Sequence, residues 1–237
     1  MAKRKTPKET LLNIYKELYN EFGPQGWWPV TRKNSLIPEY FKGKRSESQK
    51  FEIMVGAILT QNTQWKPNVE KAIEQLNRNG LMDIDRILAV SHDELCRCIR
   101  SAGYYNQKAE RLRTLAQFLK KISIRQLEKC ETQKARMLLL NLKGIGPETA
   151  DSILLYALGK PVFVVDSYTR RLLQSKGLID GSENYDDIQR LFMNNLSLDA
   201  EMFNEYHALI VQHGKMMAGK RSSHFSALGS EKKQRFK

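Results

Sequence analysis

The chain has 237 residues, enough for one large or two modest domains, and its 39 Lys and Arg against 26 Asp and Glu give a formal net charge of +13 at pH 7. Such a surplus is typical of nucleic-acid-binding proteins, although charge alone does not exclude a basic surface without that role. No apolar stretch approaches the ~20 residues of a membrane span, and the basic N-terminus lacks the apolar core of a signal peptide, so we expect a cytoplasmic protein with no membrane partner.

Hydrophobic periodicity predicts helices along almost the whole chain, and therefore an all-α fold class. The segment 48–60 is nearly continuously apolar from Phe51 onward, which indicates a buried central helix with Ser46 or Ser48 as its N-cap. The β-branched run at 162–165 is strand-like but short, so we expect a buried connector there. The other predicted helices are 10–22, 69–76, 84–88, 92–99, 107–121, 132–142, 147–158, 167–176, 185–196 and 200–217.

Two segments outside these helices are distinctive. The loop 23–45 is long for a helical protein, and long loops are often functional. The tail from Gly219 is polar and basic, and we expect disorder from Ser222 onward.

The three cysteines, Cys96, Cys98 and Cys130, are too few and odd in number for a disulfide framework. Cys96 and Cys98 lie near His92, but no fourth ligand is spaced to complete a metal site. We therefore expect thiols packed in the core and no metal centre.

The most informative segment is 142–152, in which Gly144, Ile145 and Gly146 form a turn between two helical patterns. Glycine lets the backbone turn tightly and approach a ligand closely, and Pro147 suits the first position of the second helix. The N–H groups of the turn and of the new helix favour an anion, and on a basic protein we expect this anion to be a DNA phosphate. A lone carboxylate, Asp166, follows the strand-like run.

This turn, with an aspartate at this distance behind it, resembles the hairpin of the helix-hairpin-helix DNA glycosylases, the endonuclease III superfamily. The resemblance covers about residues 10–217 and implies a two-lobed fold with a DNA cleft between the lobes. Residues 42–160 would form a helical barrel domain that ends in the hairpin, and residues 1–41 together with 161–237 would form a second helical domain.

Asp166 falls where this family keeps its catalytic aspartate. A fixed carboxylate stabilises the oxocarbenium-like sugar as the C1′–N bond opens and can orient or deprotonate the attacking water; an N-cap for the helix starting at Ser167 is the alternative role. Relatives with lyase activity place a lysine two residues after the second hairpin glycine, where its amine forms a Schiff base. This chain has Glu148 there, in what would be the base pocket, which implies a monofunctional glycosylase that uses water.

All three tryptophans fall at candidate positions for a base pocket. The GWWP segment, with Trp27, Trp28 and Pro29, and Trp65 shortly after LTQNT resemble the 3-methyladenine glycosylases of this superfamily, in which aromatic rings sandwich the alkylated base. Such bases are cationic, and a ring attracts a desolvated cation by about 0.5–2 kcal/mol. Core packing is the alternative role, above all for one of the adjacent pair.

Further residues match positions at which this family contacts DNA. Gln61 matches a glutamine that enters the duplex gap, and Tyr104 lies in a segment that resembles the family's wedge loop, where it would stack into the opened step. For Lys108, Arg111 and Arg113, phosphate contacts and an exposed helix face are equally good interpretations. The hairpin adds to the DNA-binding set Lys143, Gly144, Ile145, Gly146 and Thr149.

The resemblance therefore implies a monomeric base excision repair enzyme that removes alkylated purines from duplex DNA and associates with the nucleoid through DNA. The alternatives are a glycosylase for another lesion (mismatched thymine, uracil or an oxidised purine) and a non-catalytic DNA-binding module. Many relatives hold a [4Fe–4S] cluster on four cysteines near the C-terminus. No cysteine follows Cys130, so we expect no iron–sulfur cluster and no cofactor, although a monovalent cation can sit on the hairpin carbonyls, as in relatives.

Overall fold

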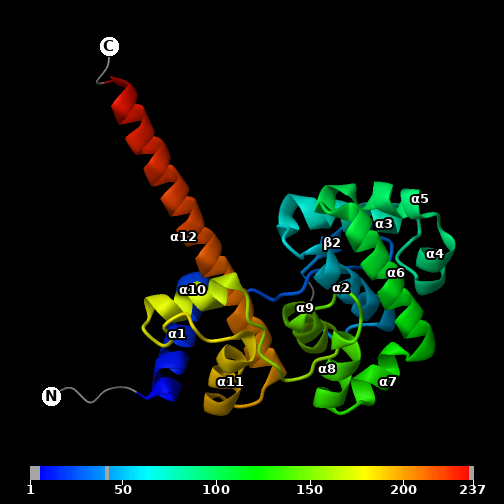
Figure 1. Ribbon diagram of the computed structural model, residues 1–237, viewed down its shortest axis with the longest axis horizontal. Coiled ribbons are helices and arrows are strands. Elements are labelled where there is room, and N and C mark those ends of the chain that lie inside the picture. Colours follow the sequence, from blue (N-terminus) through cyan, green and yellow to red (C-terminus); the bar gives the residue numbers. More distant parts are fainter. Residues whose placement is uncertain (1–5, 41–42, 235–237) are drawn as a thin grey trace. The chain divides into compact units, whose positions relative to one another are not determined.

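The computed structural model describes residues 6–40 and 43–234, with side chains up to residue 219, and most of this part is helical (Figure 1). The expected helical class is confirmed, and the segment 162–165 is the predicted buried connector. No helix in the described ranges is long and apolar enough to cross a bilayer. The chain divides into a central unit, residues 26–164 and 198–204, and a terminal unit, residues 1–25, 165–197 and 205–237.

The central unit holds the hairpin and all three tryptophans. Its α-helices are α2 (Glu47–Leu59), α3 (Glu70–Arg78), α4 (Ile84–Ala89), α5 (His92–Cys98), α6 (Tyr105–Lys121), α7 (Ile124–Lys129), α8 (Thr132–Leu140) and α9 (Pro147–Ser152). Three tighter or wider helical segments join them: η1 (Trp65–Val69) and η3 (Ile153–Ala157), which are π-helical, and η2 (Arg100–Ala102), a 3₁₀ turn. The helix α7 was not among the helices predicted from the periodicity.

Helix α2 is the centre of this unit. Every residue from Phe51 to Leu59 is buried, and α2 contacts α3, α6, α7, α9, η3 and the first strand. Its N-cap is Ser46, whose hydroxyl accepts the Gln49 N–H at 3.2 Å while the Gln49 side chain accepts the Ser46 N–H at 3.0 Å. Because a helix fills the middle, the unit is a bundle around α2, and the expected helical barrel is wrong.

The long loop forms a small antiparallel ribbon that was not predicted. Strand β1 (Val30–Thr31) pairs with β2 (Pro38–Glu39), and β1 is fastened to α2 by a buried carboxylate. The Glu52 Oε1 atom accepts the backbone N–H of Thr31 at 2.8 Å and its hydroxyl at 3.0 Å. These bonds place residues 26–40 with the central unit, whereas the sequence-based boundary had grouped them with the N-terminus.

The terminal unit contains α1 (Pro7–Phe22), α10 (Ser167–Ser175), α11 (Tyr185–Asn195) and most of α12 (Ala200–Gln234). Its core centres on Tyr206, whose hydroxyl donates to the Leu11 carbonyl at 2.9 Å and whose ring lies 5.5 Å from that of Phe192. Helix α12 extends to Gln234, and the disorder expected from Ser222 onward stays a prediction. Residues 235–237 lie outside the described part.

We expect Glu52 to make stability depend on pH. Burial raises the pKa of its carboxyl from 4.5 to about 7, so the folded state favours the protonated form. Stability should therefore fall as pH rises from about 4.5 to about 7, by a few kcal/mol at most. Urea unfolding of the wild type and of Glu52→Gln at several pH values in this range measures the effect. The variant should lose this part of the slope, and an identical slope in both proteins would contradict the assignment.

Candidate functional site

The predicted hairpin turn joins α8 to α9. Gly144 has a φ of +85°, and a Cβ atom there would lie 2.5 Å from Nε of Arg111, so only glycine fits. Ile145 is buried and anchors the turn in the core. Lys143 and Gly146 are exposed and are available to a DNA backbone. The side chain of Ile145 therefore supports the hairpin turn from inside, while its neighbours form the surface.

Gln61 lies against the hairpin. Its Nε2 atom donates to the Gly144 carbonyl at 3.0 Å and to Thr149 Oγ1 at 2.9 Å, and its Oε1 atom accepts from Arg111 Nη1. Thr149 is buried, so it serves as a partner of Gln61. Both ends of the Gln61 amide are bonded within the protein, and its entry into a duplex gap would require it to exchange these bonds for contacts with DNA.

Lys108 and Arg113 of α6 do not form an exposed face. Lys108 is 0 % exposed and donates to backbone carbonyls. Arg113 donates to the carbonyls of Leu88 and Val90 at the end of α4. For Lys108 both sequence-based interpretations are wrong, because its ammonium is buried and bonded within the protein. For Arg113 the exposed helix face is wrong, because its guanidinium is bonded to backbone carbonyls. Tyr104, the residue before the first turn of α6, is 66 % exposed.

The three tryptophans come together in one aromatic cluster in the central unit. The Trp27 ring lies 5.0 Å from that of Trp28 and 5.2 Å from that of Trp65, and Trp28 and Trp65 are 5.4 Å apart, edge to face. Trp28 and Trp65 are both 5 % exposed, whereas Trp27 is half-buried and is the more accessible ring. Pro29, beside them, is buried.

Two members of this cluster were not predicted. Tyr156, in η3 behind the hairpin, lies 5.3 Å from Trp28 between ring centroids, and Tyr40 lies 6.3 Å from Trp27. Gly56 of α2 makes room for the cluster, because a Cβ atom there would come within 2.9 Å of Cζ2 of Trp28. A glycine inside an otherwise apolar helix was the signal that could have indicated this close approach.

Asp166 is the N-cap of α10 in the terminal unit. Its Oδ1 atom accepts the Thr169 N–H at 2.7 Å and the Thr169 hydroxyl at 3.0 Å. The Oδ2 atom lies 3.7 Å from Nε2 of His207, and the Asp166 side chain is 13 % exposed. The capping role is therefore present, and it fixes one carboxylate oxygen while the other is turned toward α12.

Two basic groups of α12 face this carboxylate. Burial lowers the pKa of the His207 imidazole, and the Asp166 charge opposes that shift. Burial also lowers the pKa of the Lys215 ammonium, again opposed by Asp166. Neither group was singled out from the sequence, because helical spacing does not reveal which residues of α12 turn toward the start of α10. The Asp166 carboxylate therefore favours the protonated form of both groups.

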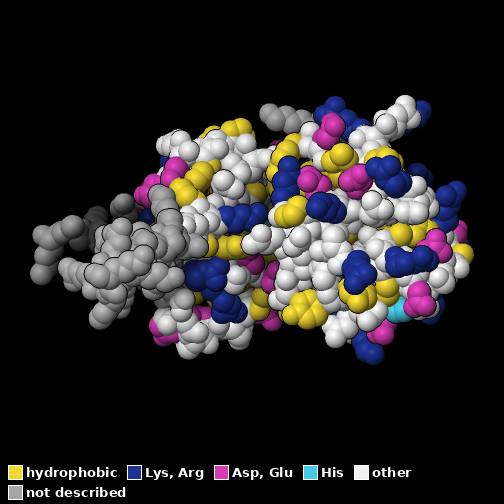
Figure 2. All heavy atoms as spheres, turned by 90° about the horizontal axis from the view of Figure 1, so that it is seen from above, with side chains coloured by type: hydrophobic (Ala, Val, Ile, Leu, Met, Phe, Trp, Pro, Cys, Tyr) yellow, Lys and Arg dark blue, Asp and Glu magenta, His cyan; other side chains and the backbone are white. Residues whose placement is uncertain are grey.

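The remaining predicted residue, Glu148, is exposed in the first turn of α9. On the face that Figure 2 shows, Lys and Arg side chains are distributed over the surface with acidic and hydrophobic side chains between them. The positive charge of the chain is therefore not gathered into one patch on that face.

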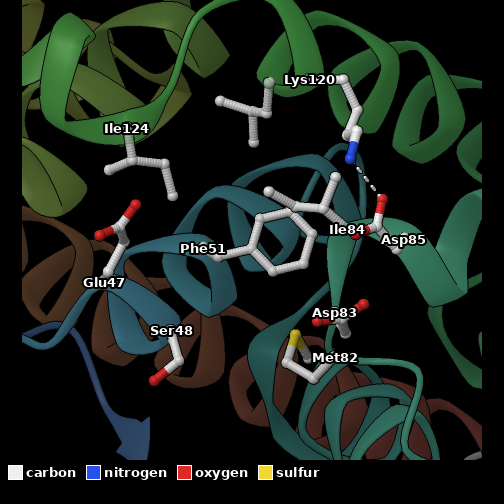
Figure 3. A pocket seen from close by; sticks show the side chains of 10 residues that line it. Glu47, Ser48, Phe51, Met82, Asp83, Ile84, Asp85, Lys120 and Ile124 are labelled. Atoms are coloured by element: carbon white, nitrogen blue, oxygen red, sulfur yellow. Dashed lines mark ion pairs between the residues drawn. The ribbon is translucent and has the colours of Figure 1, made fainter.

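Two cavities lie near the N-terminal end of α2, away from the residues predicted for the site. One, of about 430 Å³, is drawn in Figure 3, where the Phe51 ring points into it and the Lys120–Asp85 ion pair (2.8 Å) stands at its edge. The other, of about 520 Å³, is lined in part by Glu52 and Asn77. No predicted catalytic, pocket or DNA-binding residue lines either cavity.

Comparison with known proteins agrees with the geometry. The sequence model of the HhH-GPD superfamily of base excision DNA repair proteins matches residues 55–197. A protein of Methanocaldococcus jannaschii named "Putative DNA repair glycosylase" is 41 % identical over 218 residues, which cover 90 % of this chain and 91 % of the relative. Endonuclease III of Sulfolobus acidocaldarius is 29 % identical over 205 residues, which cover 86 % and 87 % of the two chains.

Solved structures share the fold. The crystal structure of H. pylori 3-methyladenine DNA glycosylase bound to 1,N6-ethenoadenine has a TM-score of 0.68 and 31 % identity, and the match covers 90 % of this chain and 99 % of that one. A trapped endonuclease III–DNA covalent intermediate has a TM-score of 0.63 and 18 % identity, with 88 % and 85 % covered. The extent of the family match and the identity to the archaeal relative show that this chain belongs to the HhH-GPD superfamily of base excision DNA repair proteins, the DNA glycosylases related to endonuclease III.

Proposed function

We propose that this glycosylase is monofunctional and hydrolyses the N-glycosidic bond of alkylated purines, of the 3-methyladenine type, in duplex DNA. The observation that carries the proposal is the cluster of Trp27, Trp28 and Trp65, extended by Tyr156. Purines methylated at N3 or N7 carry positive charge in DNA, and aromatic faces favour a desolvated cation over a neutral base. The 31 % identity to a 3-methyladenine glycosylase that binds ethenoadenine supports the same class of base.

In this proposal Asp166 supplies the chemistry. A cationic purine is already a good leaving group, so the main requirement is a negative charge near C1′ as the sugar becomes oxocarbenium-like. The bonds from Thr169 hold one oxygen of Asp166 in place, which means that the carboxylate needs little reorganisation during the reaction. The His207 ring, 3.7 Å from the other oxygen, limits the directions from which water reaches it.

The proposal includes no lyase step and no iron–sulfur cluster. Glu148 stands where lyase relatives carry the amine, and a carboxylate cannot form an imine. No cysteine follows Cys130, so the family's cluster ligands are missing from this sequence. A monovalent cation on the hairpin carbonyls, a monomeric state and a cytoplasmic, nucleoid-associated location complete the proposal.

Other lesions are the second candidate, because relatives named endonuclease III match at 29 % identity or less. A thymine, uracil or oxidised purine is neutral, so a ring cluster gives such bases stacking without the additional attraction to a cation. In a purely DNA-binding module Asp166 would have its capping role alone.

The catalytic role of Asp166 is tested by Asp166→Asn. Asparagine also caps helices, so α10 should stay intact while the charge is lost. Base release from alkylated DNA should fall at least about a hundredfold with DNA binding little changed, because the charge acts in the transition state. Single-turnover excision and a binding titration measure both. Asp83→Asn, which changes the aspartate that caps α4, is the matched control. Excision by Asp166→Asn within about threefold of wild type would contradict the role.

Glu148 predicts that the product is an unbroken strand with an abasic site. Borohydride should trap no covalent protein–DNA adduct during excision, because no amine attacks C1′ at this position. An endonuclease III on its own substrate provides the positive control for trapping. A trapped adduct with the present chain would show that another amine acts as nucleophile and would remove the monofunctional assignment.

Gly56→Ala should displace the Trp28 indole, because the new methyl group would lie 2.9 Å from its Cζ2 atom. Alanine favours a helix over glycine by about 1 kcal/mol, so weakening of α2 cannot explain a loss. We expect release of alkylated purines to fall about tenfold and the tryptophan fluorescence to change. Gly219→Ala, at a helical glycine with open space around it, is the control and should behave as wild type. Normal excision by Gly56→Ala would mean that Trp28 does not shape the base pocket.

A further inference from the structure

Lys108 is a fully buried cation near the loops that face DNA in the proposed function. It lies in α6 and is 0 % exposed. Its Nζ atom donates to the Leu59 carbonyl at 2.8 Å, the Thr63 hydroxyl at 2.8 Å and the Ala102 carbonyl at 2.7 Å. An ammonium has three N–H donors, so every one of them has an acceptor.

The three acceptors come from different segments. Leu59 is the last residue of α2, Thr63 belongs to the loop that carries Gln61, and Ala102 ends the turn before Tyr104. The Thr63 hydroxyl also lies 2.5 Å from the Ala102 carbonyl, which joins the two loops directly. One ammonium thus ties the end of the central helix to the loop 60–64 and to the loop 101–104.

Both loops contain a backbone conformation that needs support. Asn62 has a φ of 53° and Tyr104 a φ of 46°, in the left-handed region that residues other than glycine rarely adopt. Such conformations persist where the surrounding structure determines them strongly. Tyr104 is nevertheless 66 % exposed, so its own side chain contributes little to holding it. Two acceptors of Lys108 are close to these residues in the chain: Thr63 follows Asn62 directly, and Ala102 is two residues before Tyr104.

Burial of a cation in a protein core is energetically unfavourable. Removing an ammonium from water costs free energy, and a well-packed apolar side chain of similar volume often stabilises a fold as well or better. Burial and the nearby Arg111 lower the pKa of Lys108 to about 8. What the ammonium adds over an apolar side chain is three directed bonds, and these hold the loops in one arrangement.

We propose that Lys108 is a positioning residue that makes the loops 60–64 and 101–104 one rigid wedge, and that extrusion of a paired base depends on it. The inference rests on the proposed function, in which Gln61 and Tyr104 enter the opened duplex. A wedge that yields cannot replace the stacking and pairing of an intact duplex. A base without a partner needs much less force to leave the stack, so the same change should matter little there.

The test compares Lys108→Met with Lys160→Met on two DNA substrates. Lys160 is the matched control: it is also buried in the central unit, and its Nζ atom donates to the carbonyls of Glu128 (3.0 Å) and Cys130 (2.5 Å), away from both loops. The substrates carry the same alkylated purine, opposite either thymine or an abasic site. Lys108→Met should lose at least about tenfold more excision on the paired substrate than on the unpaired one. Lys160→Met should change both equally. An equal loss by Lys108→Met on both substrates would overturn the proposal.

Two additions keep the test decisive. Thr63→Val removes one acceptor and leaves the lysine in place, so it serves as the test variant if Lys108→Met does not fold. It should show a smaller loss that is again selective for the paired substrate, and an equal effect on both substrates would count against the wedge. Fluorescence of 2-aminopurine at the lesion position reports base extrusion without cleavage. If the wild type extrudes 2-aminopurine but releases no alkylated purine, the proposed substrate class is refuted. If Thr63→Val and Lys108→Met extrude 2-aminopurine as well as the wild type does, the role of Lys108 is refuted.

Discussion

The burial of α2 is the constraint on which the central unit depends. From Phe51 to Leu59 no residue of this helix reaches the surface, so it cannot shift or turn without exposing apolar side chains. Three features of this unit are attached to α2. Glu52 fastens β1 to its first half, Gly56 receives the Trp28 ring at its middle, and the Leu59 carbonyl receives Lys108 at its end. The buried helix α2 thereby sets the positions of the tryptophan cluster and of the loop that carries Gln61.

The terminal unit positions its one candidate catalytic group differently. Asp166 is held by the start of α10, where helix N–H groups stabilise a carboxylate. Because Thr169 occupies only Oδ1, the cap fixes the side chain and leaves Oδ2 facing His207. A cap therefore provides orientation, which in the proposed mechanism is most of what a carboxylate needs when the leaving group is already cationic. The buried helix α2 and the N-cap of α10 therefore each hold functional side chains in a fixed position.

The sequence predicted those parts whose signals are local. The apolar run of α2, the glycine turn at 144–146 and the capping role of Asp166 all depend on neighbours within a few residues. What it missed depends on contacts between distant segments. The ribbon β1–β2 has strands too short to show alternation, and it is held by Glu52 from another element. Lys108 carries a charge that is typical of surface residues. Only the packing of α2, α6 and η2 shows that backbone carbonyls accept its hydrogen bonds in the core. The superfamily could therefore be predicted from the sequence.

The most direct test of this account is to identify the free bases that the protein releases from methylated genomic DNA by mass spectrometry. Parallel incubations contain DNA with mismatched thymine, uracil or oxidised purines. The account predicts release of 3-methyladenine, alone or with other methylated purines, and little release of the neutral bases. Release of a neutral base with no methylated purine would contradict the proposed specificity and leave the tryptophan cluster as part of the core.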